Sequence, residues 1–111
     1  MKIVSLKDIA ATTTSHNKVG LKKQMIAPGA IPHLVQFMQA IIKPGEVVSE
    51  HKHDDLYEIF FVEEGIGVIR IDGKKYKMEK GKCITVEPKE QHEVANMGEE
   101  ELILTIFSIK V

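Results

Sequence analysis

The chain of 111 residues contains no tryptophan, few aromatic residues and a single cysteine, Cys83. With one cysteine no disulfide can form within the chain, so a disulfide-stabilised scaffold is excluded and a reducing compartment is allowed. We expect Cys83 to be a small buried residue rather than a nucleophile or a ligand. No window approaches the roughly 18 apolar residues of a membrane-spanning helix. The stretch MKIVSLKDIA lacks the apolar core of a signal peptide, so we expect a cytoplasmic protein without a membrane partner.

An excess of charge of one sign is also missing. The chain has 15 Lys and Arg against 16 Asp and Glu, a net charge of -1 and a sequence pI of about 6.5. Because a nucleic-acid partner normally requires a basic face, we expect no nucleic-acid binding. Hydrophobic residues make up 43% of the sequence, enough for one modest core. The length therefore predicts a single domain over residues 1–111.

Long helical periods are absent, because glycine and proline interrupt the sequence at strand-sized intervals. The run LVQFMQAIIK (34–43) is predicted to be a strand that ends at Pro44-Gly45. Asp72-Gly73 between VIRI and KKYKM is a two-residue hairpin signal. CITVE, HEVAN and ELILTIFSIKV are further predicted strands, and SLKDIA is a short helix or an edge strand. Many short antiparallel strands predict an all-β sandwich or small barrel.

The stretch EHKHDDLYE (50–58) brings His51, His53 and Glu58 close together in the sequence. In a strand, alternate side chains share a face, so the two histidines point the same way, with Cα atoms about 6.6 Å apart. That spacing lets two imidazoles bind one ion with bonds of about 2.1 Å. Asp54-Asp55 then predicts a turn that brings Glu58 back beside them. Two interpretations stay open from these residues alone: a solvated polar turn, or ligands of one metal ion.

A fourth ligand would have to come from elsewhere in the chain. His92 is the best candidate, because it opens the predicted strand HEVAN and shares a face with Val94 and Asn96. The remaining histidines, His16 and His33, lie outside the pattern. We expect both to be ordinary surface or turn residues. Because His33 follows Ile31-Pro32 and begins a predicted strand, a ligand role is the less favoured alternative for it.

Residues 45–65 resemble the first motif of the cupin superfamily. That motif is a glycine, five residues, His-x-His, three or four residues, a glutamate, six residues and a glycine. The stretch GEVVSEHKHDDLYEIFFVEEG matches at every specified position and spacing. The matching residues are Gly45, His51, His53, Glu58 and Gly65.

Residues 81–96, GKCITVEPKEQHEVAN, resemble the second cupin motif. Gly81, His92 and Asn96 match, whereas Glu87 and Lys89 stand where the family has proline and glycine. These departures lie in the turn before His92 and concern its backbone shape more than the ligand. If that turn requires a positive φ, Lys89 adopts it with some strain.

The resemblance implies a double-stranded β-helix, or jelly-roll barrel, with a metal ion inside. Carried over position by position, the ligands are His51, His53, Glu58 and His92, and Asn96 is structural. A set of three imidazoles and one carboxylate suits one divalent transition metal ion: iron, manganese, nickel, cobalt, copper or zinc. The two motifs and the link between them cover about half of the chain.

Two classes of function follow from this reading. The first is a small metal-dependent enzyme of the dioxygenase, isomerase or decarboxylase type, acting on a small molecule. The alternative is a non-catalytic domain that binds or senses a sugar or an organic acid. Full occupation of the ligand positions favours the enzyme. We also expect a homodimer, because the apolar LILTIFSIKV would be a liability as an unpaired edge strand.

No catalytic residue beyond the metal ligands is identified. Strand alternation directs Glu50, Tyr57 and Glu93, the neighbours of the predicted ligands, away from the ligand face. Gln36 and Gln39 lie on opposite faces of one predicted strand, so at most one of them points into a barrel. We expect a mainly apolar pocket. Five further residues are expected to be ordinary barrel core, with the pocket wall as the less favoured alternative: Phe60, Val62, Val94, Thr105 and Phe107.

Overall fold

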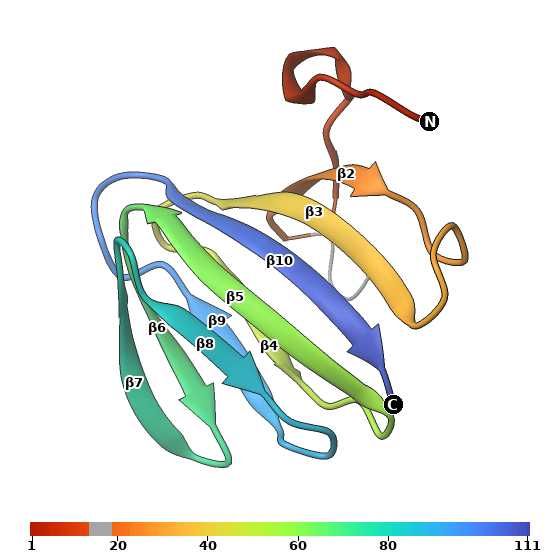
Figure 1. The fold of residues 1–111 in the computed structure, drawn as a ribbon. Helices are drawn as coiled ribbons and strands as arrows, with labels where there is room; N and C mark the ends of the chain where they lie inside the picture. The colour runs from red at the N-terminus through yellow and green to blue at the C-terminus, as the bar shows by residue number, and fades with distance from the viewer. Residues whose placement is uncertain (14–18) are drawn as a thin grey trace.

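The structure is a computed structural model that describes residues 1–13 and 19–111. His16, expected to be a surface or turn residue, lies outside the described residues. Within them the chain forms two antiparallel sheets, with strand orders β1-β2-β3-β10-β5-β8 and β4-β9-β6-β7, and a short 3-10 helix η1 (Figure 1). The bounds are η1 Leu6–Asp8, β1 Thr12–Thr13, β2 Leu21–Ile26, β3 Leu34–Ile42, β4 Val47–His51, β5 Leu56–Glu64, β6 Ile66–Ile71, β7 Lys74–Glu79, β8 Cys83–Val86, β9 His92–Ala95 and β10 Leu102–Lys110.

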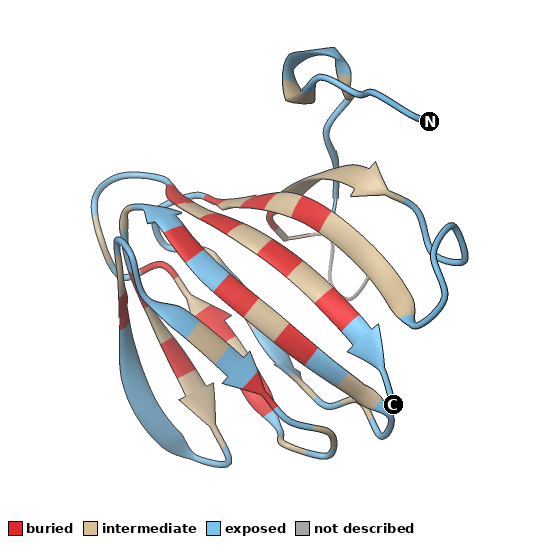
Figure 2. Ribbon diagram, viewed as in Figure 1, coloured by how far each residue is buried: buried red, intermediate tan, exposed pale blue. Residues whose placement is uncertain are grey.

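The core lies between the two sheets. Along β3, β5 and β10, buried residues alternate with less buried ones, because successive side chains of a strand point to opposite faces (Figure 2). The buried apolar side chains form one cluster: Met38, Ala40, Ile42, Phe60, Val62, Ile69, Met78, Val86, Val94, Leu102, Leu104 and Ile106. The all-β jelly-roll architecture predicted from the sequence is confirmed.

Most of the predicted strands are present. The hairpin at Asp72-Gly73 joins β6 to β7, and both turn residues have a positive φ, 48° and 84°, as a two-residue turn of this type requires. The stretch SLKDIA holds η1, the helical alternative of the two. Strand β2 was not predicted, because LKKQMI shows neither alternation nor a continuous apolar run.

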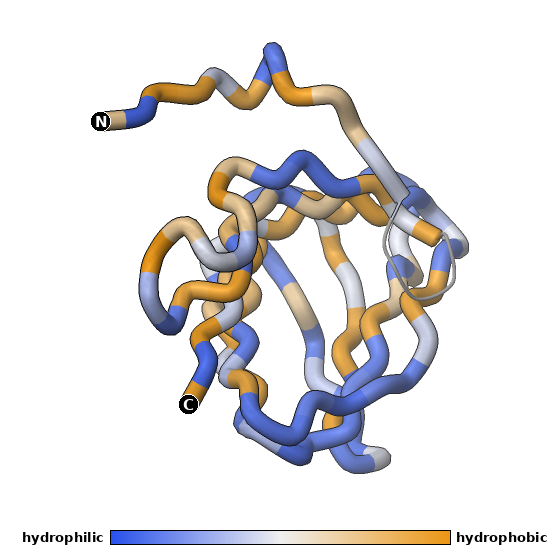
Figure 3. The backbone as a smooth tube through the Cα atoms, turned by 90° about the vertical axis from the view of Figure 1, so that its right-hand side faces the viewer, coloured by the Kyte–Doolittle hydropathy of each residue, from blue (hydrophilic) through white to orange (hydrophobic). Residues whose placement is uncertain are grey.

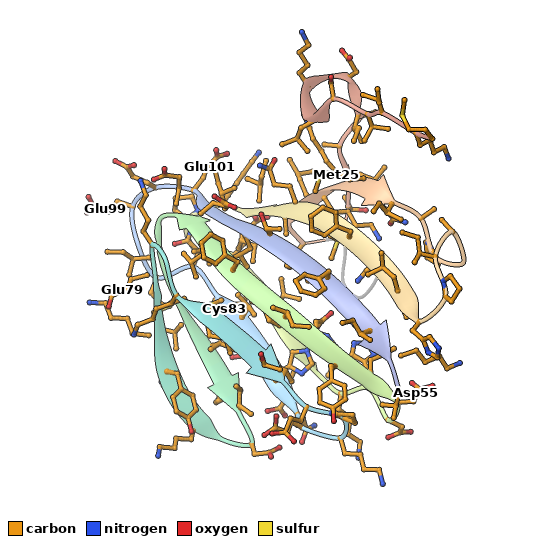
Figure 4. All side chains as sticks on the ribbon, in the orientation of Figure 1. Met25, Asp55, Glu79, Cys83, Glu99 and Glu101 are labelled. Atoms are coloured by element: carbon orange, nitrogen blue, oxygen red, sulfur yellow. The ribbon has the colours of Figure 1, made fainter. Side chains whose placement is uncertain are left out.

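Two expectations were wrong: the edge position of LILTIFSIKV and the burial of Cys83. The apolar strand β10 is not at an edge but lies between β3 and β5, so its backbone is hydrogen-bonded on both sides. Cys83 is exposed on β8, the edge strand of the six-stranded sheet (Figure 4). Cys83 pairs with Phe61 of β5, and paired residues of neighbouring strands project from the same face of a sheet. Because Phe61 points outward, the Cys83 side chain lies on the outer face as well.

The N-terminal segment runs outside the two sheets (Figure 3). Its first apolar side chains are solvent-exposed, with Ile3 80% and Val4 52% accessible, whereas Leu6 and Ile9 are partly buried. In the part of the chain that the structure describes, no helix has the length and apolar character needed to cross a membrane.

Candidate metal centre

The predicted ligands come from strands β4, β9 and β5 and from the segment that follows β4. His51, the last residue of β4, lies directly opposite His92, the first residue of β9. Glu58 comes from β5 in the other sheet and is buried. His53 lies beyond the end of β4 rather than within the strand, contrary to the alternation argument. The cluster therefore draws side chains from both layers of the barrel.

The structure brings the four side chains together. One ligand atom from each of His51, His53, Glu58 and His92 can be chosen so that all lie within 4.8 Å of one another. The ring centroid of His51 is 5.2 Å from that of His53 and 4.3 Å from that of His92. Two atoms on opposite sides of an ion with bonds of about 2.1 Å lie about 4.2 Å apart, so small shifts suffice to close on one ion.

Backbone carbonyls set the orientation of two of the rings. His51 Nδ1 donates to the Ser49 carbonyl over 2.9 Å, and His92 Nδ1 donates to the Glu90 carbonyl over 3.1 Å. Because a carbonyl oxygen can only accept, the hydrogen stays on Nδ1 and Nε2 is the nitrogen available to a metal. In both cases the carbonyl lies two residues before the histidine.

Glu58 stands at the centre of a buried hydrogen-bond chain. Its Oε1 accepts from His92 Nε2 over 2.9 Å, and its Oε2 accepts from Ser108 Oγ over 3.4 Å. Gln36 Nε2 in turn donates to Ser108 Oγ over 3.5 Å. Sequence reasoning missed Ser108, although a signal existed: it is the polar residue in an inward row of β10 that otherwise reads Leu102, Leu104, Ile106.

Burial and hydrogen bonding oppose each other in the titration of this pair. Burial alone raises the pKa of the Glu58 carboxyl, but the hydrogen bond and the positive charge of His92, with smaller effects of His53 and His51, bring it below its usual value. Burial alone lowers the pKa of His92, but its hydrogen bonds to Glu58 and Glu90 raise it above the usual value. Without a metal the site therefore favours a carboxylate facing an imidazolium.

A cavity of about 230 Å³ opens beside the cluster. Phe60 and Val94 line it, as considered from the sequence, whereas Val62 belongs to the closed core. Thr105 and Phe107 are on the outer face of β10. There the Thr105 hydroxyl donates a hydrogen bond to Glu63, and Phe107 packs against Phe37. The full lining is Lys22, Val35, Gln36, Met38, Ala40, Ile42, Val48, His51, His53, Leu56, Glu58, Phe60, His92, Val94, Leu104 and Ile106.

The turn before His92 keeps a positive φ despite its unusual sequence. Lys89 has φ 72°, and its N–H donates to the His53 carbonyl over 2.7 Å. This bond attaches the turn between β8 and β9 to a predicted ligand residue. The backbone shape that a glycine would favour is therefore present at Lys89, at a cost in strain.

Residues next to the ligands point away from the cavity, as the alternation predicted. Arg70 Nη2 lies 3.1 Å from Glu93 Oε2 and 3.9 Å from Glu50 Oε2 on the outer face of the four-stranded sheet. His33 lies outside the cluster as well: it has φ 70° in the turn before β3, and its carbonyl accepts from the Lys110 N–H. Of the two glutamines, Gln36 lines the cavity and Gln39 does not.

The donor set fits a divalent transition metal. A buried carboxylate faces the imidazoles, and burying such a charge is costly unless a cation compensates it. Three nitrogen donors and one oxygen donor match the preferences of first-row ions such as iron, manganese, cobalt, nickel, copper and zinc. When bound, such an ion would supply Lewis-acid chemistry, and redox chemistry where the metal allows it.

Comparison with known proteins supports the architecture. A family model described as Cupin domain matches residues 38–109. An uncharacterised protein of Methanocaldococcus jannaschii is 35% identical over 60 residues, which cover 54% of this chain and 48% of that protein. An oxalate-binding protein of Thermotoga maritima is 26% identical over 99 residues, covering 89% and 69% of the two chains. The chain spans from about half to just over two thirds of the length of the curated relatives it matches.

Among solved structures, a protein of Thermotoga maritima described as a predicted oxalate decarboxylase superimposes with a TM-score of 0.91. It is 23% identical, and the match covers 99% of this chain and 100% of that one. At this level of identity the likeness concerns the fold.

Proposed function

Since the chain belongs to the cupin family, we propose that it is a metal-binding protein in which His51, His53, Glu58 and His92 hold one divalent transition metal ion. The observation that carries the proposal is the convergence of these four side chains, within 4.8 Å of one another, from strands of both sheets. An apolar sandwich has no structural need for three imidazoles and a buried carboxylate at one point.

Elemental analysis of the purified protein tests this proposal. We expect close to one equivalent of metal in the wild type and a strong loss in His51→Ala and Glu58→Ala. His33→Asn is the matched control, because His33 lies outside the cluster and asparagine tolerates its positive φ. Equal metal content in all four proteins would count against the site.

We propose further that the metal site is catalytic and that it acts on a small organic molecule in the adjoining cavity. The ligands leave part of the ion's coordination sphere open if the geometry is octahedral, and an open position is what Lewis-acid catalysis requires. Relatives named for binding or decarboxylating oxalate support a small carboxylic acid as the ligand class. The reaction belongs to the decarboxylase, isomerase or dioxygenase type.

The second candidate is a domain that binds the same molecule without turning it over. The cavity favours this candidate in one respect: among its described lining residues, Lys22 is the single proton-transfer group apart from the four predicted ligands. Turnover assays with a panel of acids, sugars and phenols, at defined metal content, separate the two. Binding without product at every metal would support the second candidate.

We also propose that residues 1–111 form one domain that pairs into a homodimer. The single core cluster supports the one domain. The outer face of the six-stranded sheet supports the dimer, because Phe37 and Phe107 meet there edge to face at 6.1 Å and Phe61 is 38% exposed. Sedimentation tests it: Phe61→Glu should yield a species of 12.5 kDa, whereas Tyr76→Glu, on the other sheet, should not. A wild-type mass of one chain would overturn it.

A further inference from the structure

Lys22 is an unusual residue in the wall of the cavity. Among the described lining residues it is the one Lys or Arg side chain, and the rest of the wall beyond the four predicted ligands is apolar apart from Gln36. Lys22 lies directly opposite Ala40 in the β2–β3 ladder. Because partners in an antiparallel ladder project from the same face, Lys22 shares the inward face of buried Ala40.

Lys22 has no ion-pair partner among the residues that the structure describes. No described carboxylate pairs with it, and residues 14–18 contain no acidic residue. A partly buried ammonium group without a counter-ion costs free energy. The chain therefore presents a cation toward the cavity whose natural complement is an anion from outside.

The predicted metal ligands and Lys22 mark two separate ends of the cavity. Gln36, Ser108 and Glu58 lie in register across β3, β10 and β5. Ala40, the partner of Lys22, is four residues further along β3, which is about 13 Å in the strand direction. Between these two levels the wall consists of Met38, Ile106 and Phe60.

Both ends favour negative charge once a metal is bound. A dication with the single carboxylate of Glu58 leaves a net charge of about +1 at one end, and Lys22 adds a positive charge at the other. The apolar middle offers no partner for hydroxyl groups, so a sugar would lose hydrogen bonds to water without replacement. A volume of about 230 Å³ limits the ligand to a small molecule.

From this arrangement we propose that the cavity binds a small dicarboxylic acid longer than oxalate. One carboxylate lies at the four-residue cluster, the carbon chain packs against Met38, Phe60 and Ile106, and the second carboxylate pairs with Lys22 Nζ. This inference deepens the proposed function, since its first carboxylate occupies the proposed metal site. Lys22 is then the residue that sets specificity for the far end of the ligand.

Titration calorimetry with oxalate, succinate and adipate, and with butyrate and hexanoate as monocarboxylates of matched length, tests the inference on the full chain. We expect succinate or adipate to bind more tightly than oxalate and than the matched monocarboxylate. Lys22→Met should weaken the binding of the preferred dicarboxylate about tenfold or more, because it removes a charge-assisted hydrogen bond. The affinities for the monocarboxylates should stay unchanged. Lys22→Arg should retain most of the affinity.

Lys23→Met is the matched control. Lys23 lies opposite Gln39 on the outward face of the same strand, and its Nζ donates to the Leu6 carbonyl over 3.3 Å. The substitution makes the same change in net charge without touching the cavity, so we expect unchanged binding. Equal losses in Lys22→Met and Lys23→Met, or oxalate binding as tightly as the longer acids, would overturn the inference.

Metal content measured before each titration keeps the two proposals apart. If the wild type takes up metal but no dicarboxylate binds, the ligand inference fails and the proposed metal site stands. If the wild type takes up no metal, the proposed function fails, and the same titrations on the metal-free protein still decide the role of Lys22. A dicarboxylate preference that disappears in Lys22→Met supports that role, and its absence overturns it.

Discussion

Ser108 and Glu58 face each other across the β10–β5 ladder, and the Ser108 hydroxyl donates to Glu58 Oε2 over 3.4 Å. The serine is fully buried, so its hydroxyl has no water with which to exchange this bond. It holds one carboxylate oxygen in place and leaves the other directed at His92. The orientation of the predicted oxygen ligand is thus set by a strand from which no predicted ligand comes.

We expect Ser108→Ala to weaken metal binding about tenfold, because residues that orient metal ligands typically contribute that much to affinity. Competition with a chromogenic chelator measures the change. Thr105→Ala is the control, since Thr105 donates to Glu63 over 2.8 Å on the outer face of the same strand. Wild-type affinity in Ser108→Ala would show that Glu58 needs no such support.

The free energy of unfolding of the metal-free protein should depend on pH through Glu58 and His92. The lowered pKa of Glu58 contributes stability above its ordinary value of 4.5, which is lost as the pH falls through the folded pKa. The raised pKa of His92 contributes stability below its ordinary value of 6.5, which is lost as the pH rises through the folded pKa. The pair therefore stabilises the fold most between these two values.

Urea unfolding in the presence of a chelator, repeated across this pH range, measures the effect. Glu58→Gln removes the charge that stabilises the His92 imidazolium, so the decline above pH 6.5 should flatten in that variant. A wild-type profile that rises steadily through neutral pH and is unchanged in Glu58→Gln would contradict the prediction.

Metal affinity should rise with pH, whereas the stability contributed by His92 in the metal-free protein declines as the pH rises. His92 Nε2 must lose its proton before it can bind a metal, and its raised pKa makes that loss harder than for an ordinary histidine. We therefore expect affinity to rise with pH until His92 is deprotonated in the free protein. Chelator competition at a series of pH values, with a correction for the protonation of the chelator, measures the slope. A flat response would mean that His92 is not a ligand.

Replacing Lys89 by glycine should stabilise the protein by about 1 kcal/mol, because glycine adopts its φ of 72° without strain. The backbone N–H remains, so the bond to the His53 carbonyl is kept. Lys89→Ala is the control at the same position, since alanine is strained there as well and should leave the melting temperature nearly unchanged. Equal melting temperatures for all three proteins would mean that the turn carries no strain.

Two motif glycines with similar φ should respond differently to alanine. A Cβ on Gly65, φ 90°, would collide with the Glu101 carbonyl oxygen and lie 2.9 Å from Leu102 Cα, whereas one on Gly45, φ 83°, would meet nothing within 4 Å. Gly45→Ala should therefore cost about 1 kcal/mol from the backbone alone, and Gly65→Ala at least about 2 kcal/mol more through displaced backbone. Chemical denaturation measures both. Equal losses of stability in the two variants would mean that the loop before β10 moves away from the added Cβ without a cost in free energy.

Local pattern was sufficient for much of this fold. Asp72-Gly73 specifies its own turn, and the alternation around Glu58 and His92 places both side chains on inward faces. Spacing places His51 and His53 in the cluster even though His53 lies beyond the end of its strand. These features depend on residues close together in the sequence, so they can be predicted from one sequence.

Other features depend on which strands pair, and the local pattern does not contain that information. Lys22 faces inward because of its register with Ala40, yet LKKQMI alone shows no preferred face. The central position of β10 follows from pairing with β3 and β5, which are distant in sequence. Cys83 is outside because its register with Phe61 places it on the outer face of β8, although CITVE itself suits burial.

Glu58 belongs to the six-stranded sheet, whereas His51 and His92 belong to the other. An ion coordinated by all of them is a cross-link between the two halves of the sandwich, and parting these halves breaks the coordination. The free ion concentration would then affect the stability of the fold: at a thousand times the dissociation constant, binding adds about 4 kcal/mol to the free energy of unfolding. A shortage of that metal would therefore weaken the fold itself as well as any reaction that the ion supports.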